Sequence, residues 1–134
     1  MSGGLGGARR LILVVDDETD ISRAYGHVLT DAGYEVEIAP TGTEAVALVA
    51  ARHPDLIILD LMLPDMHGLD VLRAIRDPDK RVRMPVVVTL SNFHDTDMME
   101  RAFKLGAVGA VAKSSLNLAD LPTHVAEWLP RRPI

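Results

Sequence analysis

The chain has 134 residues, of which 48% are hydrophobic and 25% are charged, with no cysteine and a formal net charge of −5. This length suits one domain that folds without disulfide or zinc staples. The absence of cysteine excludes a disulfide scaffold, a thiolate metal site and a cysteine nucleophile. The acidic balance argues against direct binding to nucleic acid. The apolar run Leu11–Val15 is too short for a signal segment or a membrane span, so we expect a cytoplasmic protein with no membrane partner.

The two ends of the chain are set apart from the rest by composition. Four of the first seven residues are glycine, and residues 1–10 are interpreted as a flexible leader. Prolines at positions 130 and 133 cannot continue a helix, so residues 130–134 are interpreted as a tail or the start of a linker. Residues 11–129 remain as the predicted domain.

The first half of that domain alternates between strand and helix signals. Leu11–Val15 is apolar without polar alternation, as in a strand buried on both faces. Apolar residues at helical spacing over Ile21–Ala32 then predict a helix that ends at Gly33. Tyr34–Ala39 alternates more and predicts a strand nearer the edge of the sheet. The Ala- and Val-rich stretch Thr41–Ala51 predicts a second helix.

The same alternation continues through the middle of the chain. Leu56–Leu59 and Val86–Leu90 are apolar runs that predict buried strands. Between them, Leu69–Ile75 marks a helix that ends near the Asp-Pro pair at positions 77 and 78. A fourth helix is predicted over Met98–Leu105 and closed by Gly106.

A weaker strand and a final helix complete the pattern. Val108–Ala112 is a strand candidate, and Leu118–Leu129 predicts a helix with Pro122 near its start. Five strand–helix repeats imply an α/β fold with a doubly wound, five-stranded parallel sheet and right-handed crossovers. In such a sheet the ligand site lies at the carboxyl ends of the strands.

Polar side chains follow four of the predicted strands at that edge. Asp16 and Asp17 come after the first, Asp60 after the third, Ser91 after the fourth and Lys113 after the fifth. Each has an ordinary explanation by itself, since Asp and Ser after a strand often cap the next helix and a lone Lys is usually solvated. Their occurrence together at four strand ends favours a site.

The residue types predict the chemistry of that site. Clustered carboxylates repel one another unless a cation joins them, and oxygen ligands without cysteine favour a hard ion, Mg²⁺ or Mn²⁺. Such an ion accepts phosphoryl oxygens, and Lys113 and Ser91 are suited to the same group. A carboxylate can act as the nucleophile by forming an acyl phosphate. Asp60 is the best candidate, because it stands alone after a central strand.

Four segments, in order and at matching spacing, resemble the receiver domains of bacterial two-component response regulators, the CheY-like family. They are LILVVDDE, DLIILDLMLPDMHG, PVVVTLS and KLGAVGAVAKS. The resemblance covers nearly all of the chain from Leu11 to Leu129. It implies a flavodoxin-like (βα)₅ fold in which Asp60 is the phosphoacceptor. Asp16 and Asp17 would hold Mg²⁺ together with Asp60 and the backbone carbonyl of Met62.

The resemblance also assigns the remaining groups and the partners. Lys113 matches the lysine that pairs with the phosphoryl group. The phosphodonor would be a sensor histidine kinase or a histidine phosphotransfer protein. The surface of the fourth helix, fifth strand and fifth helix would bind a second copy or a downstream protein. The chain would act as a signalling switch, catalysing only its own phosphorylation and dephosphorylation.

The family also has a hydroxyl that binds the phosphoryl group, the switch hydroxyl, and two residues of this chain are candidates for it. Counting five residues on from Pro85 lands on Leu90, whereas counting back 22 residues from Lys113 lands on Ser91. Ser91 is preferred because the number of residues from it to Lys113 then matches the family spacing without a gap. Thr89 is the alternative, since a bulge or a shifted strand start would present it instead.

Two departures from the family pattern concern the output rather than the phosphorylation chemistry, and a third is milder. Ala110 stands where the family usually has Tyr or Phe, and it cannot act as an aromatic toggle. Ser114 replaces the usual Pro after the lysine, and a cis bond there would cost about 2.5–4 kcal/mol. His67 stands where Asp or Asn is commoner.

Two other functions are weighed against the phosphoryl switch. One is a small Mg²⁺-dependent hydrolase with an aspartyl-phosphate intermediate. The chain is too short to supply a cap that encloses the substrate of such an enzyme. The other is a receiver-like docking module that takes no phosphate, which Ala110 and Ser114 favour. The complete set of acidic, hydroxyl and lysine groups favours the switch.

Overall fold

The computed structural model describes residues 9–76, 84–91 and 96–130. The predicted leader, apart from its last two residues, and most of the predicted tail lie outside these residues. Five strands alternate with five helices, and two short 3₁₀ helices precede the last helix. The elements are β1 (Leu11–Val15), α1 (Thr19–Asp31), β2 (Glu35–Ala39), α2 (Gly42–Arg52), β3 (Leu56–Asp60), α3 (Gly68–Ile75), β4 (Val86–Ser91), α4 (Thr96–Lys104), β5 (Gly109–Ala112), η1 (Lys113–Ser115), η2 (Leu118–Asp120) and α5 (Leu121–Trp128). The predicted order of elements is confirmed.

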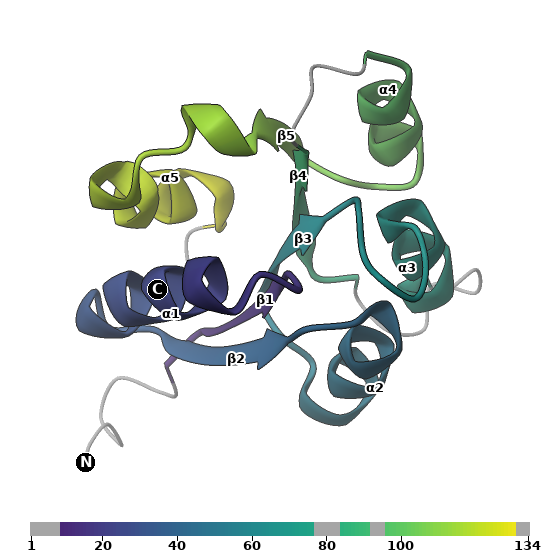
Figure 1. Cartoon of the computed structure of the whole chain (residues 1–134). Helices are drawn as coiled ribbons and strands as arrows, with labels where there is room; N and C mark the ends of the chain where they lie inside the picture. Colours follow the sequence, from purple (N-terminus) through teal and green to yellow (C-terminus); the bar gives the residue numbers. More distant parts are fainter. Residues whose placement is uncertain (1–8, 77–83, 92–95, 131–134) are drawn as a thin grey trace.

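The strands form one parallel sheet in the order β2-β1-β3-β4-β5 (Figure 1). The edge position expected for β2 and the central position expected for the strand before Asp60 are both confirmed. The chain reverses its direction of winding between β1 and β3, and that switch point is where a doubly wound sheet opens a crevice at its carboxyl edge. Asp16 follows one of these two strands and Asp60 ends the other.

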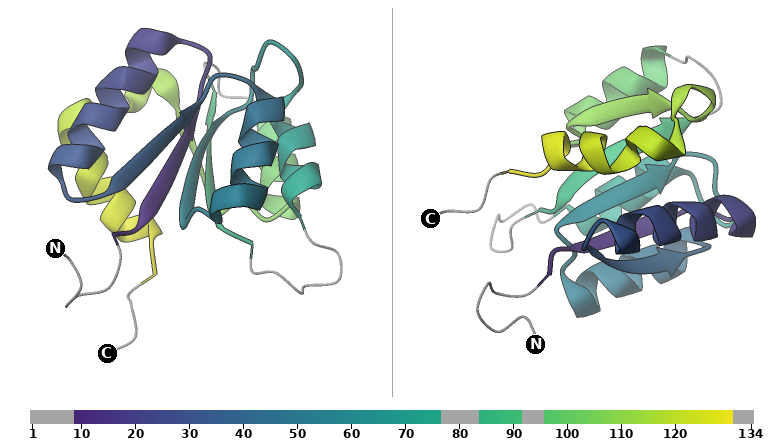
Figure 2. Two further views of the ribbon diagram at one scale, coloured as in Figure 1. Left: turned by 90° about the horizontal axis from the view of Figure 1, so that it is seen from below. Right: turned by 90° about the vertical axis from the view of Figure 1, so that its left-hand side faces the viewer.

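Two hydrophobic layers enclose the sheet because both faces of its central strands are apolar. α1 and α5 cover one face, where Val14, Ile58 and Leu90 are buried with Leu29 and Val125. The helices α2, α3 and α4 cover the other face, where alternate strand residues are buried with side chains of these helices. Figure 2 shows the helices on the two sides of the sheet. This packing fixes the strand ends and therefore the groups attached to them.

The chain after β5 differs from one continuous predicted helix. Lys113 begins the short η1, and Leu116 N donates to Lys113 O at 3.2 Å to close that turn. A second turn, η2, then leads into α5, which has Pro122 in its first turn, where a missing N–H is tolerated. No cis peptide bond occurs in residues 9–76, 84–91 and 96–130, so the bond from Lys113 to Ser114 is trans.

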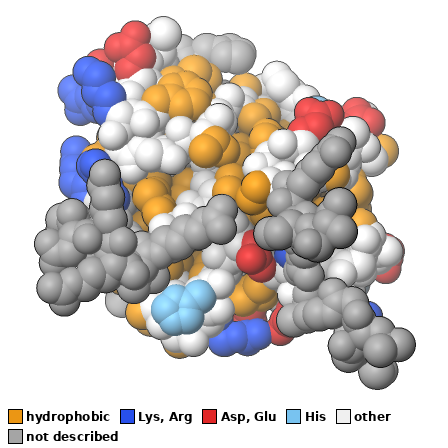
Figure 3. All heavy atoms as spheres, turned by 180° about the vertical axis from the view of Figure 1, so that it is seen from behind, with side chains coloured by type: hydrophobic (Ala, Val, Ile, Leu, Met, Phe, Trp, Pro, Cys, Tyr) orange, Lys and Arg blue, Asp and Glu red, His pale blue; other side chains and the backbone are white. Residues whose placement is uncertain are grey.

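The opposite end of the sheet has a different surface. Figure 3 views the molecule from behind, from the side where the strands begin. Hydrophobic side chains gather over the middle of this face. The polar groups singled out in the sequence belong to the carboxyl end, which faces the viewer in Figure 1. Of the helices that the structure describes, none has the length and apolar character needed to cross a membrane.

Candidate functional site

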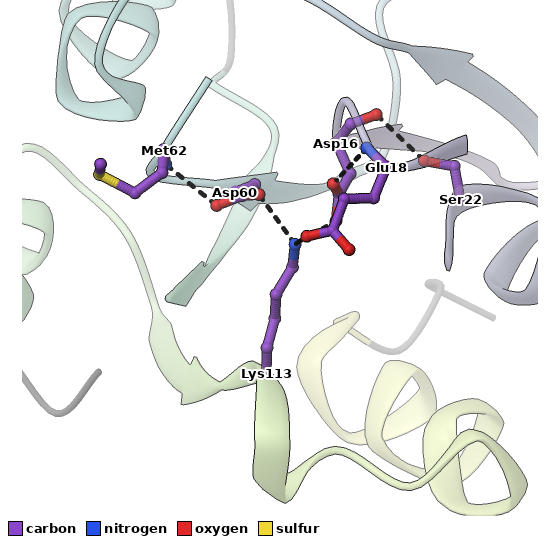
Figure 4. A network of polar contacts seen from close by, with 6 residues as sticks. All are labelled: Asp16, Glu18, Ser22, Asp60, Met62 and Lys113. Atoms are coloured by element: carbon purple, nitrogen blue, oxygen red, sulfur yellow. Dashed lines mark hydrogen bonds and ion pairs between the residues drawn. The ribbon is translucent and has the colours of Figure 1, made fainter. Parts of the chain in front are cut away.

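The carboxyl edge of the sheet brings Asp16, Asp60 and Lys113 into direct contact (Figure 4). The Lys113 Nζ atom lies 2.7 Å from Asp16 Oδ2 and 2.9 Å from Asp60 Oδ2. The exposed fractions of the side chains are 8% for Lys113, 1% for Asp16 and 4% for Asp60. Three residues that are distant in the sequence therefore form a buried polar centre, as their places at the strand ends predicted.

Asp16 is held by the loop that it begins. Its Oδ1 atom accepts a hydrogen bond from Glu18 N at 2.9 Å, and its backbone carbonyl accepts one from Ser22 Oγ at 3.1 Å. Asp16 Oδ2 is buried and, despite its closeness to Lys113 Nζ, has no hydrogen bond of acceptable geometry. Burial raises the pKa of Asp16, although Lys113 and the Glu18 N–H oppose this effect. Asp16 is therefore a carboxylate with an incompletely satisfied oxygen.

The Asp60 carboxylate is oriented from both sides. Its Oδ1 atom accepts a hydrogen bond from Met62 N at 2.9 Å, and its Oδ2 atom accepts one from Lys113 Nζ at 2.9 Å. The following loop turns back closely, since Gly68 N donates to Leu61 O at 2.8 Å. A Cβ atom added at Gly68 would lie 2.8 Å from Asp60 O. Close backbone packing thus fixes the position of Asp60.

Lys113 stays charged in this environment. Burial by itself would lower the pKa of the Lys113 ammonium, but the close carboxylates of Asp16 and Asp60 together outweigh burial and raise this pKa above its ordinary value. The ammonium thus offsets part of the repulsion between the two carboxylates. A fixed cation beside Asp60 is also suited to bind the oxygens of an attached anion.

The acidic residues fit a divalent metal ion. One carboxylate oxygen from each of Asp16, Asp17 and Asp60 lies within 4.8 Å of the others, and Asp17 is exposed whereas the other two residues are buried. The donors are all oxygens, as Mg²⁺ and Mn²⁺ prefer. The incompletely satisfied Asp16 Oδ2 atom supplies a ligand without loss of a well-formed hydrogen bond. The residues present therefore suit a hard cation, in agreement with the prediction from the sequence.

The two candidates for the switch hydroxyl occupy different places in β4. Leu90 lies beside Asp60 in the sheet register, so Ser91 is one residue further toward the carboxyl edge and Thr89 is one residue further back. Thr89 is 1% exposed, and its Oγ1 atom lies 3.5 Å from Gly109 O within the sheet. Ser91 is half-buried at the end of the strand. This placement favours Ser91.

The sequence did not assign three side chains that support the site. Glu18 Oε1 lies 3.2 Å from Lys113 Nζ and makes a third carboxylate contact. His67 Nδ1 accepts a hydrogen bond from Leu69 N at 3.1 Å and caps α3. Asp65 accepts from Thr43 Oγ1 and from the backbone of Gly42 and Thr43, which lowers the pKa of Asp65 to about 2. In the sequence, Glu18 stands directly after the acidic pair, and His67 stands out only as a departure from the family pattern.

Residues 12–126 match the profile of a family described as the response regulator receiver domain. A relative with 29% identity over 119 residues is the sporulation initiation phosphotransferase F of Bacillus subtilis; the match covers 89% of this chain and 93% of the relative. The transcriptional regulatory protein KdpE of Mycobacterium tuberculosis is 42% identical over 103 residues. That match covers 77% of this chain but 44% of KdpE, so the similarity spans less than half of that relative.

Solved structures give the same result for the fold. The chemotaxis response regulator CheY4 of Vibrio cholerae is 30% identical and superposes with a TM-score of 0.81, covering 91% of this chain and 100% of CheY4. The signal receiver domain of a LuxO repressor protein from Vibrio parahaemolyticus is 32% identical, with a TM-score of 0.79 and coverage of 90% and 89%. Sequence and fold thus point to the same family.

Proposed function

This chain belongs to the response regulator receiver domain family, and from that premise we propose that Asp60 is its phosphoacceptor. The carboxylate would take a phosphoryl group from a phosphohistidine on a sensor histidine kinase or a histidine phosphotransfer protein. The observation that most strongly supports this role is the buried Asp60 carboxylate, oriented by Met62 N and Lys113 Nζ beside two further acidic residues.

Asp16, Asp17 and Asp60 would hold Mg²⁺ or Mn²⁺, with the backbone carbonyl of Met62 as a further ligand. When bound, the ion would neutralise negative charge between the carboxylates and the incoming phosphoryl oxygens. The protein's own part is to hold the three carboxylates close together before the ion arrives. Burial of Asp16 and Asp60 keeps their charges poorly screened and makes the site selective for a cation.

In the transfer step an oxygen of Asp60 attacks phosphorus in line with the phosphorus–nitrogen bond of the phosphohistidine. The new oxygen–phosphorus bond forms as the old bond breaks, and the imidazole nitrogen leaves with the bonding electron pair. The Met62 N–H and the Lys113 ammonium hold the Asp60 carboxylate in place for this attack. The product is an acyl phosphate on Asp60.

Lys113 and Ser91 would then bind oxygens of the attached phosphoryl group. Lys113 already touches Asp60, and Ser91 ends the neighbouring strand β4. Each charge-assisted hydrogen bond is worth about 1.5–3 kcal/mol, which is enough to shift the populations of two arrangements of the β4 and β5 ends. The switch resets when water attacks phosphorus and releases inorganic phosphate, which regenerates the Asp60 carboxylate.

The output surface is proposed on α4, β5 and α5. Phe103 on α4 and Val108 before β5 are large hydrophobic residues with 48% and 56% exposure. Lys113 follows β5 directly, so a movement of Lys113 toward a phosphoryl group would be passed to this surface. A second copy of the chain or a downstream protein would bind there. We place the protein in the cytoplasm, where it would meet the phosphodonor.

The proposal is tested by labelling with radioactive acetyl phosphate in the presence of Mg²⁺. The wild-type chain should incorporate acid-labile phosphate, and Asp60→Asn should incorporate none, because the amide is a poor nucleophile. Asp70→Asn is the matched control, since Asp70 is an exposed aspartate on α3 that pairs with Arg73 outside the acidic centre. Undiminished labelling of Asp60→Asn would remove Asp60 from the proposed role. Turnover of simple phosphate esters would favour a hydrolase instead.

A further inference from the structure

Lys113 has three carboxylate partners, and they are not equivalent. Asp16 and Asp60 are also candidate metal ligands, so any cation bound there competes with the Lys113 ammonium for their oxygens. Glu18 lies 3.2 Å from Lys113 Nζ but is outside the group of carboxylates that come close enough together to share an ion among the described residues. Glu18 is therefore the lysine partner that stays available when the others are engaged.

The local structure around Glu18 indicates that its side chain has no other task in the helix. Glu18 occupies the N-cap position of α1, where Ser, Thr, Asp and Asn are preferred because their short side chains cap the helix. The Glu18 side chain makes no cap hydrogen bond. Its backbone is nevertheless fixed, since its N–H donates to Asp16 Oδ1 and its carbonyl accepts from Ser22 N at 3.0 Å. The side chain is thus held at the rim with its carboxylate on Lys113 (Figure 4).

We propose that Glu18 is a positioning residue for Lys113. An ammonium has three N–H donors, and the three carboxylates surround it. Glu18 keeps the ammonium at the rim of the site, next to Asp60, when the oxygens of Asp16 and Asp60 turn to a cation or a phosphoryl group. Without Glu18, Lys113 pairs with Asp16 and Asp60 alone and opposes a cation there more strongly. The inference rests on the proposed metal and phosphoryl site.

The contact itself can be tested without metal or phosphate. The chain contains three lysines, at positions 80, 104 and 113, so spectra of protein labelled with ¹³C and ¹⁵N in lysine are simple. The Lys113 signal is assigned by its loss in Lys113→Met. Glu18→Gln should shift the Lys113 Cε and Nζ signals of the metal-free protein. Asp20→Asn is the matched control, because Asp20 is an exposed acid in the first turn of α1 and forms no ion pair with Lys113 in the described structure. An unmoved Lys113 signal in Glu18→Gln would overturn the inference.

The consequence for the site is tested by Mg²⁺ titration of the whole chain, followed by calorimetry. Glu18→Gln should weaken Mg²⁺ binding by about two- to fivefold, the size expected of a partly exposed ion pair. The same substitution in a Lys113→Met background should leave the affinity of that background unchanged, because Glu18 acts through Lys113. Asp20→Asn should match the wild-type chain.

The outcomes distinguish a failure of the positioning role of Glu18 from a failure of the proposed metal site. An equal loss of affinity with and without Lys113 would mean that Glu18 acts directly through its charge, which overturns the positioning role and leaves the proposed metal site standing. Failure of the wild-type chain to bind Mg²⁺ at all would overturn both. A loss confined to the background that retains Lys113 supports the inference.

Discussion

At the scale of single residues, the hydroxyl on β4 is the group whose place the structure sharpens most. Ser91 and Thr89 lie on either side of the level of Asp60, but Thr89 is buried within the sheet near Gly109 whereas Ser91 ends the strand. A hydroxyl that binds a phosphoryl group on Asp60 must be at the carboxyl edge. The fold therefore supports counting back from Lys113 rather than forward from Pro85, which places the extra residue within β4.

Substitution of the two hydroxyls gives opposite expectations. Ser91→Ala should lower the steady-state level of phosphorylated chain by about tenfold or more, because one charge-assisted hydrogen bond to the phosphoryl group is lost. Thr89→Val, which keeps the shape of a buried side chain, should leave that level close to wild type. Labelling with acetyl phosphate and Mg²⁺ at several times measures both. The reverse pattern would assign the hydroxyl to Thr89.

The site residues differ in how far sequence alone could place them. Asp16 and Asp60 each follow a buried apolar run and Lys113 follows a weaker, half-buried one, so strand topology was enough to bring them together. Glu18 could not be placed in this way, because its contact depends on where α1 starts and on the path of the Lys113 side chain. The cap at His67 was likewise missed, since imidazole is not among the usual N-cap groups.

At the scale of elements, the connection between β3 and α3 decides how firmly Asp60 is held. The connection packs so closely that a Cβ atom at Gly68 would lie 2.7 Å from Leu61 Cα. Within the connection, Asp65 ties it to the start of α2 by accepting hydrogen bonds from Gly42 N at 2.8 Å and Thr43 N at 2.9 Å. Periodicity predicted both neighbouring helices, but these tertiary ties involve loop residues with no periodic signal.

Two glycine-to-alanine substitutions should therefore have effects of opposite sign. Gly68→Ala forces the backbone beside Asp60 to shift and should destabilise the chain by about 1–3 kcal/mol, with slower labelling by acetyl phosphate. Gly26→Ala, in the middle of α1, adds a Cβ atom 3.6 Å from Ile38 Cδ1 and should stabilise the chain by about 0.5–1 kcal/mol without a change in labelling. Urea unfolding measures both free energies. Equal stability of the two variants would contradict the tight packing at Gly68.

At the scale of the whole molecule, the fold concentrates negative charge at the carboxyl edge of the sheet. Of the net charge of −5, a large part is local, since four acids gather at this edge and, among the described residues, Lys113 is the ammonium that contacts them; the acids are Asp16, Asp17, Glu18 and Asp60. Burial of Asp16 raises its pKa, which shows that the folded state holds this charge unfavourably. The parallel sheet is the cause, because its topology brings polar strand ends to one edge whatever their charge. Without metal, this buried charge lowers the stability of the fold, although the ion pairs of Lys113 offset part of the loss.

Mg²⁺ should restore that stability in the wild-type chain but not in Asp17→Asn. The variant should therefore be the more stable protein without Mg²⁺ and the less stable one with it. Without metal, Asp17→Asn should be at least as stable as the wild-type chain, because one of three carboxylates whose oxygens lie within 4.8 Å becomes neutral. With Mg²⁺ at a hundredfold excess over its dissociation constant, the wild-type chain gains about 2.7 kcal/mol by mass action, whereas the variant should gain little. Thermal unfolding with and without Mg²⁺, at constant ionic strength, follows the crossover. The same gain in both proteins would mean that Asp17 is not a ligand and that the ion binds elsewhere. A crossover would show that the cluster is built for its cation at the expense of the metal-free fold.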